Sequence, residues 1–175
     1  MRRRLFSVLC LAPIALAVSL GAQETRARIR LPGFKEPFPI EDVVVPFELN
    51  AAFSKAFAAV AAAFDDLELP VNISDKSQGL VGNTKIQALR DLAGNRLTRL
   101  LDCGSKSTGL NAETYRISLV FLALLDSIDA NHTKVRVGFT AGAEPPGGSA
   151  RDAVNCSSSG VLEQQLIDLA KLRLR

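Results

Sequence analysis

The segment from Asn50 to Leu67 alternates apolar and polar positions with the period of an α-helix. Large apolar residues recur in it every three or four positions, at Phe53, Phe57, Val60, Phe64 and Leu67. This spacing places them on one face of a helix, and Asn50 is expected to be the N-cap residue. We expect this face to belong to the core, with Phe57 and Phe64 buried between the helix and a sheet.

Shorter apolar or alternating segments predict strands. They lie at 43–45, 71–73, 80–89, 97–103, 111–125, 134–143 and 154–156. The 134–143 segment is the clearest, because Val135, Val137 and Phe139 alternate with charged residues and glycine. We expect 43–45 to be an edge strand, since Pro46 cannot donate a ladder hydrogen bond.

The segment 111–125 fits two structures. Tyr115, Ile117 and Leu119 alternate as they would in a strand, whereas Asn111 and Glu113 suit the start of a helix. The end of the segment is apolar on both faces. We favour a strand, because the alternating segment that follows it would then be its antiparallel partner.

A second helix is predicted at the end of the chain. Ser157 to Gly160 suits a helix N-terminus, and Leu162, Leu166 and Leu169 follow at helical intervals. The order of elements therefore predicts an α+β fold, in which an antiparallel sheet of about five to six strands packs against two helices.

A polar turn is predicted from Asp75 to Gly79. The side chain of Asp75 is suited to accept a backbone N–H two residues further on, and Gly79 to adopt a positive φ. We expect these residues to be structural first. Asp75, Gln78 and Gly79 are also the candidate recognition site in this turn.

The N-terminus has the pattern of an export signal. Three arginines precede an apolar run from Leu5 to Leu20, and the small residues Gly21 and Ala22 follow. A membrane anchor is the alternative, but the run is short and contains Pro13. We predict a signal peptide at 1–22, a Pro-rich linker or arm at 23–41 and a single domain at 42–175. The mature protein would not span a membrane.

Removal of the signal changes the charge and the cysteine count. The chain has 21 basic and 18 acidic residues, and the signal carries three arginines and no acids, so the mature chain has no net charge. This balance removes the argument for nucleic acid as a partner. Cys103 and Cys156 become the only cysteines, and we predict that they form a disulfide in an oxidising compartment.

The amphipathic helix, the turn residues Asp75-Lys76-Ser77-Gln78-Gly79-Leu80 and the later strands and helix together resemble the helix-grip domains of BamC, an envelope lipoprotein of the outer-membrane assembly machinery. The similarity in architecture covers residues 43–174. It implies a helix-grip-like fold and a place in the periplasm or cell envelope of a bacterium. The chain differs from that family in having one such domain, a cysteine pair and no lipobox cysteine.

Catalytic chemistry has few candidates in this sequence. His132 is the only histidine and lies among turn residues, so we expect it to be solvated in a loop. Two bonded cysteines leave no free thiol nucleophile, and with one histidine they cannot build a zinc site. Asp65 with Asp66 is more typical of a solvated helix end than of a calcium site. We therefore predict no catalytic residues, metal or cofactor.

Two classes of function remain. The first is a non-enzymatic, exported envelope domain that binds a protein partner or another envelope component, through the open face of the sheet, the loops or the arm. The alternative is a small-ligand or lipid carrier with an apolar cavity between helix and sheet. A large internal cavity would favour the carrier, and a packed core with an apolar surface patch would favour the binding domain.

Overall fold

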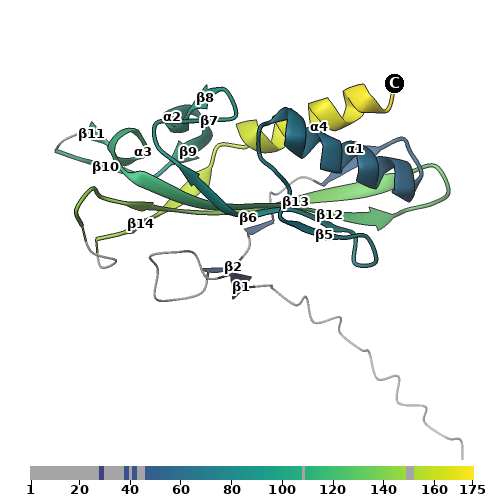
Figure 1. Cartoon of the computed structure of the whole chain (residues 1–175), viewed down its shortest axis with the longest axis horizontal. Coiled ribbons are helices and arrows are strands. Elements are labelled where there is room, and N and C mark those ends of the chain that lie inside the picture. The colour runs from purple at the N-terminus through teal and green to yellow at the C-terminus, as the bar shows by residue number, and fades with distance from the viewer. Residues whose placement is uncertain (1–27, 30–37, 40, 43–45, 108, 149–151) are drawn as a thin grey trace, which may run out of the picture.

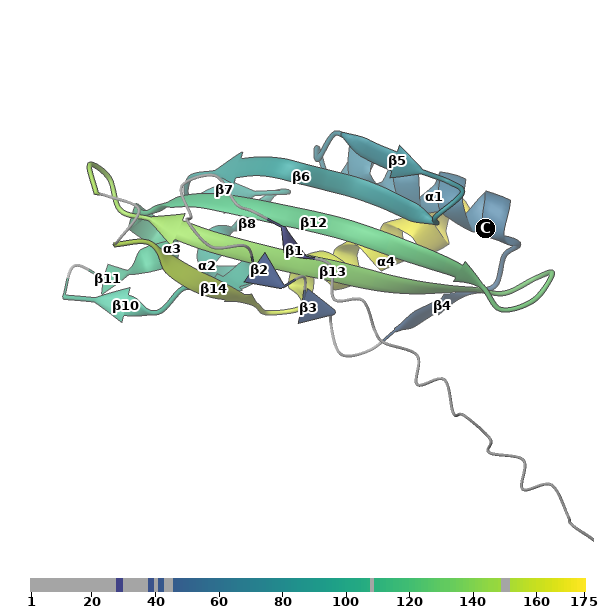
Figure 2. The ribbon, with the colours of Figure 1, turned by 90° about the horizontal axis from the view of Figure 1, so that it is seen from below.

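The computed structural model describes residues 28–29, 38–39, 41–42, 46–107, 109–148 and 152–175. A long antiparallel hairpin lies at the centre of the sheet: β12 (Arg116–Ser127) pairs with β13 (Thr133–Glu144) along its whole length. The other strands extend the sheet in the order β5-β6-β12-β13-β14-β9 (Figures 1 and 2). Their bounds are β5 (Ile73–Asp75), β6 (Leu80–Ala88), β14 (Val154–Ser158) and β9 (Leu101–Asp102).

Three strands share the edge of β13 that faces away from β12. β14 pairs with Ala141 to Ala143, and β4 (Phe47–Leu49) pairs with Thr133 to Val135. Between them β3 (Glu41–Asp42) pairs with Phe139 and Gly138. The chain that enters the domain therefore runs along this edge before the first helix begins.

Helices α1 (Phe53–Asp66) and α4 (Val161–Arg173) cover one face of the sheet (Figure 1). The expected face of α1 is buried: Phe57 is 7% exposed and Phe64 0%. The ring centroids of Phe64 and Phe121 are 5.4 Å apart, and this contact joins α1 to β12. The predicted α+β fold, with an antiparallel sheet packed against two helices, is confirmed.

The helix start differs from the prediction. The N-cap residue is Ala52 rather than Asn50, and no side chain caps the helix. The preceding residues are held by tertiary bonds, because the Thr133 hydroxyl donates to the carbonyl oxygen of Ala51 at 2.8 Å. The chain therefore enters the helix two residues later than a local capping rule indicates.

The predicted strand at 97–103 is wrong in its first half. Leu97 to Leu100 form α2, a single helical turn, and only Leu101 and Asp102 are extended, as β9. Leu97 and Leu100 are both buried. A strand would point them to opposite faces, whereas positions three apart in a helix share one face. Burial of both leucines explains the helical turn.

Both structures considered for 111–125 are present in succession. α3 (Asn111–Thr114) is one helical turn, and β12 follows from Arg116. Two small hairpins flank these short helices. They are formed by β7 (Asp91–Leu92) with β8 (Asn95–Arg96), and by β10 (Ser105–Lys106) with β11 (Gly109–Leu110).

The predicted signal peptide at 1–22 and the predicted strand at 43–45 lie outside the described residues. Within the arm, β1 (Arg28–Ile29) pairs with β2 (Phe38–Pro39) as a two-stranded ribbon. This ribbon lies on the side of the sheet opposite the helices (Figure 1).

Candidate functional site

The face of the sheet that points away from α1 and α4, here called the outer face, carries an apolar patch. On β12, Ile117, Leu119 and Phe121 belong to the core under the helices. The residues between them point to the opposite side, because side chains alternate along a strand. The apolar members of the outer face are Ile73, Leu80, Val120, Leu122 and Leu124.

Glycines lie beside the central leucine of this patch. Leu122 is opposite Gly82 on β6 and Gly138 on β13, so these three form one row across the sheet. One row pairs Val120 with Thr140, and the next pairs Ser118 with Gly142. Leu122 is itself buried. Because glycine has no side chain, Leu122 can lie close to the backbone of Gly82, where an added Cβ would be 2.9 Å from a methyl carbon of Leu122.

Charged residues border one end of the patch. Arg136 lies in the same row as Leu124, and its guanidinium is 3.1 Å from the carboxylate of Asp126. Lys134 follows on the same face, opposite Asp126. Arg136 and Lys134 are half-buried. An apolar centre with a charged border is the usual composition of a protein-binding surface.

The predicted turn from Asp75 to Gly79 is present. One carboxylate oxygen of Asp75 accepts the backbone N–H of Ser77 at 2.9 Å and that of Gln78 at 3.2 Å. The Ser77 hydroxyl also donates to it, and these bonds lower the pKa of Asp75. Gly79 has the predicted positive φ, with a value of 67°. One oxygen of the Asp75 carboxylate is thus bonded within its own turn.

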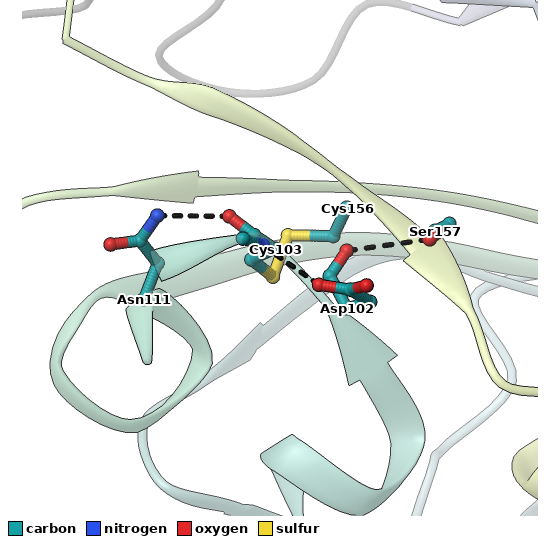
Figure 3. Close-up of a disulfide and its surroundings, with 6 residues drawn as sticks. Asp102, Cys103, Asn111, Cys156 and Ser157 are labelled. Atoms are coloured by element: carbon teal, nitrogen blue, oxygen red, sulfur yellow. Dashed lines mark hydrogen bonds between the residues drawn. A yellow bond between two sulfur atoms is a disulfide. The ribbon is translucent and has the colours of Figure 1, made fainter. Parts of the chain in front are cut away.

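The predicted disulfide joins Cys103 and Cys156, whose Cα atoms are 4.1 Å apart (Figure 3). Both residues are buried. Asn111 donates its side-chain N–H to the carbonyl oxygen of Cys103 at 2.9 Å, which ties α3 to the bond. The structure does not bring the disulfide and the turn together. Cys156 pairs with Ala141, whereas Asp75 pairs with Leu80 in the row of Leu124 and Arg136. The labelled strands β14 and β5 accordingly lie toward opposite ends of the sheet (Figures 1 and 2).

The candidate catalytic groups occupy ordinary structural positions. His132 lies in the β12–β13 turn, with its ring Nδ1 2.8 Å from Asp129. The carboxylate of Asp129 also accepts the backbone N–H of Asn131, and these bonds lower its pKa. Asp66 pairs with Arg173 of α4. Among the residues that the structure describes, no three metal-binding side chains gather at one place.

The space between α1 and the sheet is filled by side chains. Phe64 and Phe121 meet there, and both are fully buried. A hollow of about 280 Å³ is found instead at the surface, lined by Glu48, Leu49, Asn50, Lys171, Leu174 and Arg175. Four of these six residues are polar or charged and the hollow lies outside the core, so it is not an apolar cavity between helix and sheet.

Comparison of the chain with protein-family models, curated proteins and solved structures finds no significant match. Within the described part of the chain, no helix has both the length and the apolar character needed to cross a membrane.

Sequence reasoning named the open face of the sheet as one possible binding region but identified none of its residues. A signal for them was present: the end of β12 is apolar at successive positions, as in Val120, Phe121 and Leu122. Such a run predicts burial on both faces of a strand. Which residues of the other strands lie beside Leu122 depends on the register, which a single sequence does not define.

Proposed function

We propose that this chain is an exported, non-enzymatic domain of a bacterial cell envelope that binds a protein partner through the outer face. The observation that carries the proposal is the apolar patch around Leu122, which points away from the helices and is bordered by Arg136 and Lys134. The disulfide supports export, since such bonds persist in oxidising compartments. The resemblance of residues 43–174 to the BamC domains supports a location in the cell envelope.

The packing of the core favours a binding domain over a small-ligand or lipid carrier. A carrier needs an apolar cavity between helix and sheet. Phe64 and Phe121 occupy that space in this fold. A purified carrier would retain lipid or another small molecule, so native mass spectrometry that detects a stoichiometric ligand would support the carrier instead.

Site-specific photo-crosslinking in the native envelope tests the binding surface. A photoreactive amino acid at Arg136 should give a discrete crosslinked species, because this position borders the patch. The same amino acid at Lys55, exposed on α1, is the matched control and should give none. Equal crosslinking at the two positions, or none at Arg136, would contradict the proposal.

Export is tested separately by the mass of the mature protein. We expect the mature chain to begin at Gln23, after removal of 1–22. A periplasmic or envelope fraction that contains the chain with residues 1–22 intact would contradict the predicted signal cleavage.

A further inference from the structure

The strand β4 forms a free edge of the sheet. Phe47 lies opposite Val135 and Glu48 opposite Lys134, and among the described strands only β13 pairs with β4. Figure 2 shows β4 as the outermost strand beside this end of β13. The side of β4 that faces away from β13 is therefore open to another chain.

The backbone of Glu48 points toward this open side. In an antiparallel ladder the N–H and C=O of one residue point to the same side, and the side alternates along the strand. The N–H of Leu125 donates to Gly79, which precedes β6, so the groups of Leu125 point away from β13. Those of Val135, opposite Leu125, then point toward Phe47. Glu48, the next residue of β4, therefore has its N–H and C=O on the free side.

The side chain of Glu48 points away from the hollow beside β4. Its neighbour Leu49 is 1% exposed and belongs to the core under the helices, and side chains alternate along a strand. Glu48 is therefore on the outer face, in one row with Lys134 and Asp126. The hollow, which Leu49 and Asn50 line together with the end of α4, thus borders the backbone of Glu48.

The end of α4 gives the hollow a positive charge. Lys171 and Arg175 both line it, and neither side chain has an ion-pair or hydrogen-bond partner among the described residues. The negative end of a helix dipole is equivalent to only about half an elementary charge, so the two cations dominate. Leu49 and Leu174 supply apolar surface beside them. This lining suits an acidic side chain with an apolar neighbour.

The hollow is small and held in shape by hydrogen bonds. Its volume of about 280 Å³ is slightly below the usual range of small-molecule sites, about 300 to 1,000 Å³, and fits one or two side chains of a peptide. The N–H of Ala51 donates to the carbonyl oxygen of Leu49 at 2.9 Å, and the Thr133 hydroxyl donates to that of Ala51 at 2.8 Å. These bonds fix the end of β4 before a ligand arrives, which lowers the cost of binding.

We propose that the free edge of β4 binds an extended segment of another protein, which adds a strand beside Glu48 and places an acidic side chain next to Lys171 and Arg175. Hydrogen bonds to the backbone of Glu48 supply affinity, and the charged hollow supplies specificity, as in other complexes formed by strand addition. The site is separate from the patch around Leu122 and does not depend on the function proposed for that patch.

A peptide library supplies the probe. The mature protein selects from a phage-displayed library of random heptapeptides, with the soluble variant Lys171→Gln, Arg175→Gln in excess as competitor. We expect the enriched sequences to share an aspartate or glutamate at one position, and synthetic copies of them to bind the parent. A failure to enrich any sequence, or enriched sequences without a shared acidic position, would overturn the proposal.

Glu48→Pro tests the backbone contact. Proline removes the N–H that faces the free edge and leaves the bonds between β4 and β13 intact. We expect the affinity for the selected peptide, measured by fluorescence polarisation, to fall about tenfold or more, with little change in melting temperature. Glu48→Ala alters only the side chain on the outer face and is the matched control, with the affinity of the parent. Equal binding by the proline variant and the control would overturn strand addition.

The peptide itself carries the same test should Glu48→Pro fail to fold. Its backbone nitrogens are methylated one at a time, and each methylated peptide is titrated against the parent protein. Methylation of the nitrogen that donates to Glu48 should weaken binding about tenfold. A peptide that tolerates methylation at every position would overturn strand addition.

The charge at the hollow is tested by two substitutions. Lys171→Gln and Arg175→Gln should each weaken binding about threefold, as expected for partly exposed ion pairs. Lys55→Gln, on the exposed side of α1, is the control and should have no effect. With the acidic residue of the peptide replaced by its amide, the two hollow variants should bind as the parent does. Losses that persist with the neutral peptide would overturn the assignment of the acidic side chain to this hollow.

Sedimentation distinguishes another protein from a second copy of this chain. The parent should be a monomer at the concentrations of the binding assay. A dimer that Glu48→Pro dissociates would identify a second copy as the occupant of the β4 edge and would overturn the proposal.

Discussion

Gly79 and Leu125 are in direct backbone contact at the end of the sheet. The N–H of Leu125 donates to the carbonyl oxygen of Gly79 at 2.9 Å, and a Cβ atom on Gly79 would lie 2.1 Å from the carbonyl oxygen of Leu125. Two features of this position therefore favour glycine. There is no space for a Cβ atom, and the φ of 67° disfavours any other residue.

Gly79→Ala should therefore destabilise the fold by about 3 kcal/mol or more, from positive-φ strain together with displacement of β12. Gly94→Ala is the matched control: its φ is 71°, but nothing lies within 4 Å of the added Cβ. We expect it to cost only about 1 kcal/mol. Urea unfolding of both variants measures the difference, and equal losses would show that the contact with Leu125 is unimportant.

The Asp75 turn is predicted to be structural before it is functional. Asp75→Ala removes the acceptor of two backbone N–H groups and should lower the melting temperature. Gln78→Ala, which leaves that acceptor intact, should have little effect. The yield of the crosslink from position 136 should decrease only in proportion to the loss of thermal stability. Loss of the crosslink with an unchanged melting temperature would identify the turn as a recognition site.

Replacement of Phe64 by alanine should cost about 3 to 5 kcal/mol, because it leaves a cavity against Phe121. Phe57→Ala should also fall in or near this range, since Phe57 is buried. Phe53 is only half-buried and provides the control, with a smaller expected loss. Chemical denaturation measures the three variants. A loss below about 1 kcal/mol for Phe64→Ala would mean that the apolar face of α1 does not belong to the core.

The disulfide closes a sequence separation of 53 residues. Removing it with Cys103→Ala and Cys156→Ala should destabilise by about 4 kcal/mol in the chain-entropy description. Reduction of the parent protein should have a comparable effect on the melting temperature. If the double variant unfolds at the same denaturant concentration as the oxidised parent, the bond does not stabilise the fold.

The ion pair between Asp66 and Arg173 should contribute to acid sensitivity. The guanidinium of Arg173 lowers the pKa of Asp66 below its usual value of 3.8, mainly by hydrogen bonding. A group whose pKa is lower in the folded state stabilises the fold above 3.8, and this stabilisation is lost as the pH falls through the folded pKa. The melting temperature of Asp66→Asn should thus fall less than that of the parent below about pH 4. If the melting temperatures of the variant and the parent fall equally with pH, the ion pair does not contribute to acid sensitivity.

The sequence by itself determined the features that depend on local period and local hydrogen bonding. The helical spacing of Phe57 and Phe64, the alternation from Val135 to Phe139 and the turn from Asp75 to Gly79 involve residues a few positions apart. Such patterns identify the element and the face that it buries. The disulfide also followed from the sequence, because the predicted removal of the signal would leave Cys103 only one possible partner within the chain.

Only the tertiary structure decided the features that depend on distant residues. Leu97 and Leu100 form a helical turn because both are buried in the core, and Ala52 is the N-cap residue of α1 because Thr133 holds the carbonyl group of Ala51. The patch around Leu122 exists because β6 and β13 place glycines beside it. Strand register is set by packing across the whole sheet. A local sequence pattern therefore does not predict which residues of different strands become neighbours.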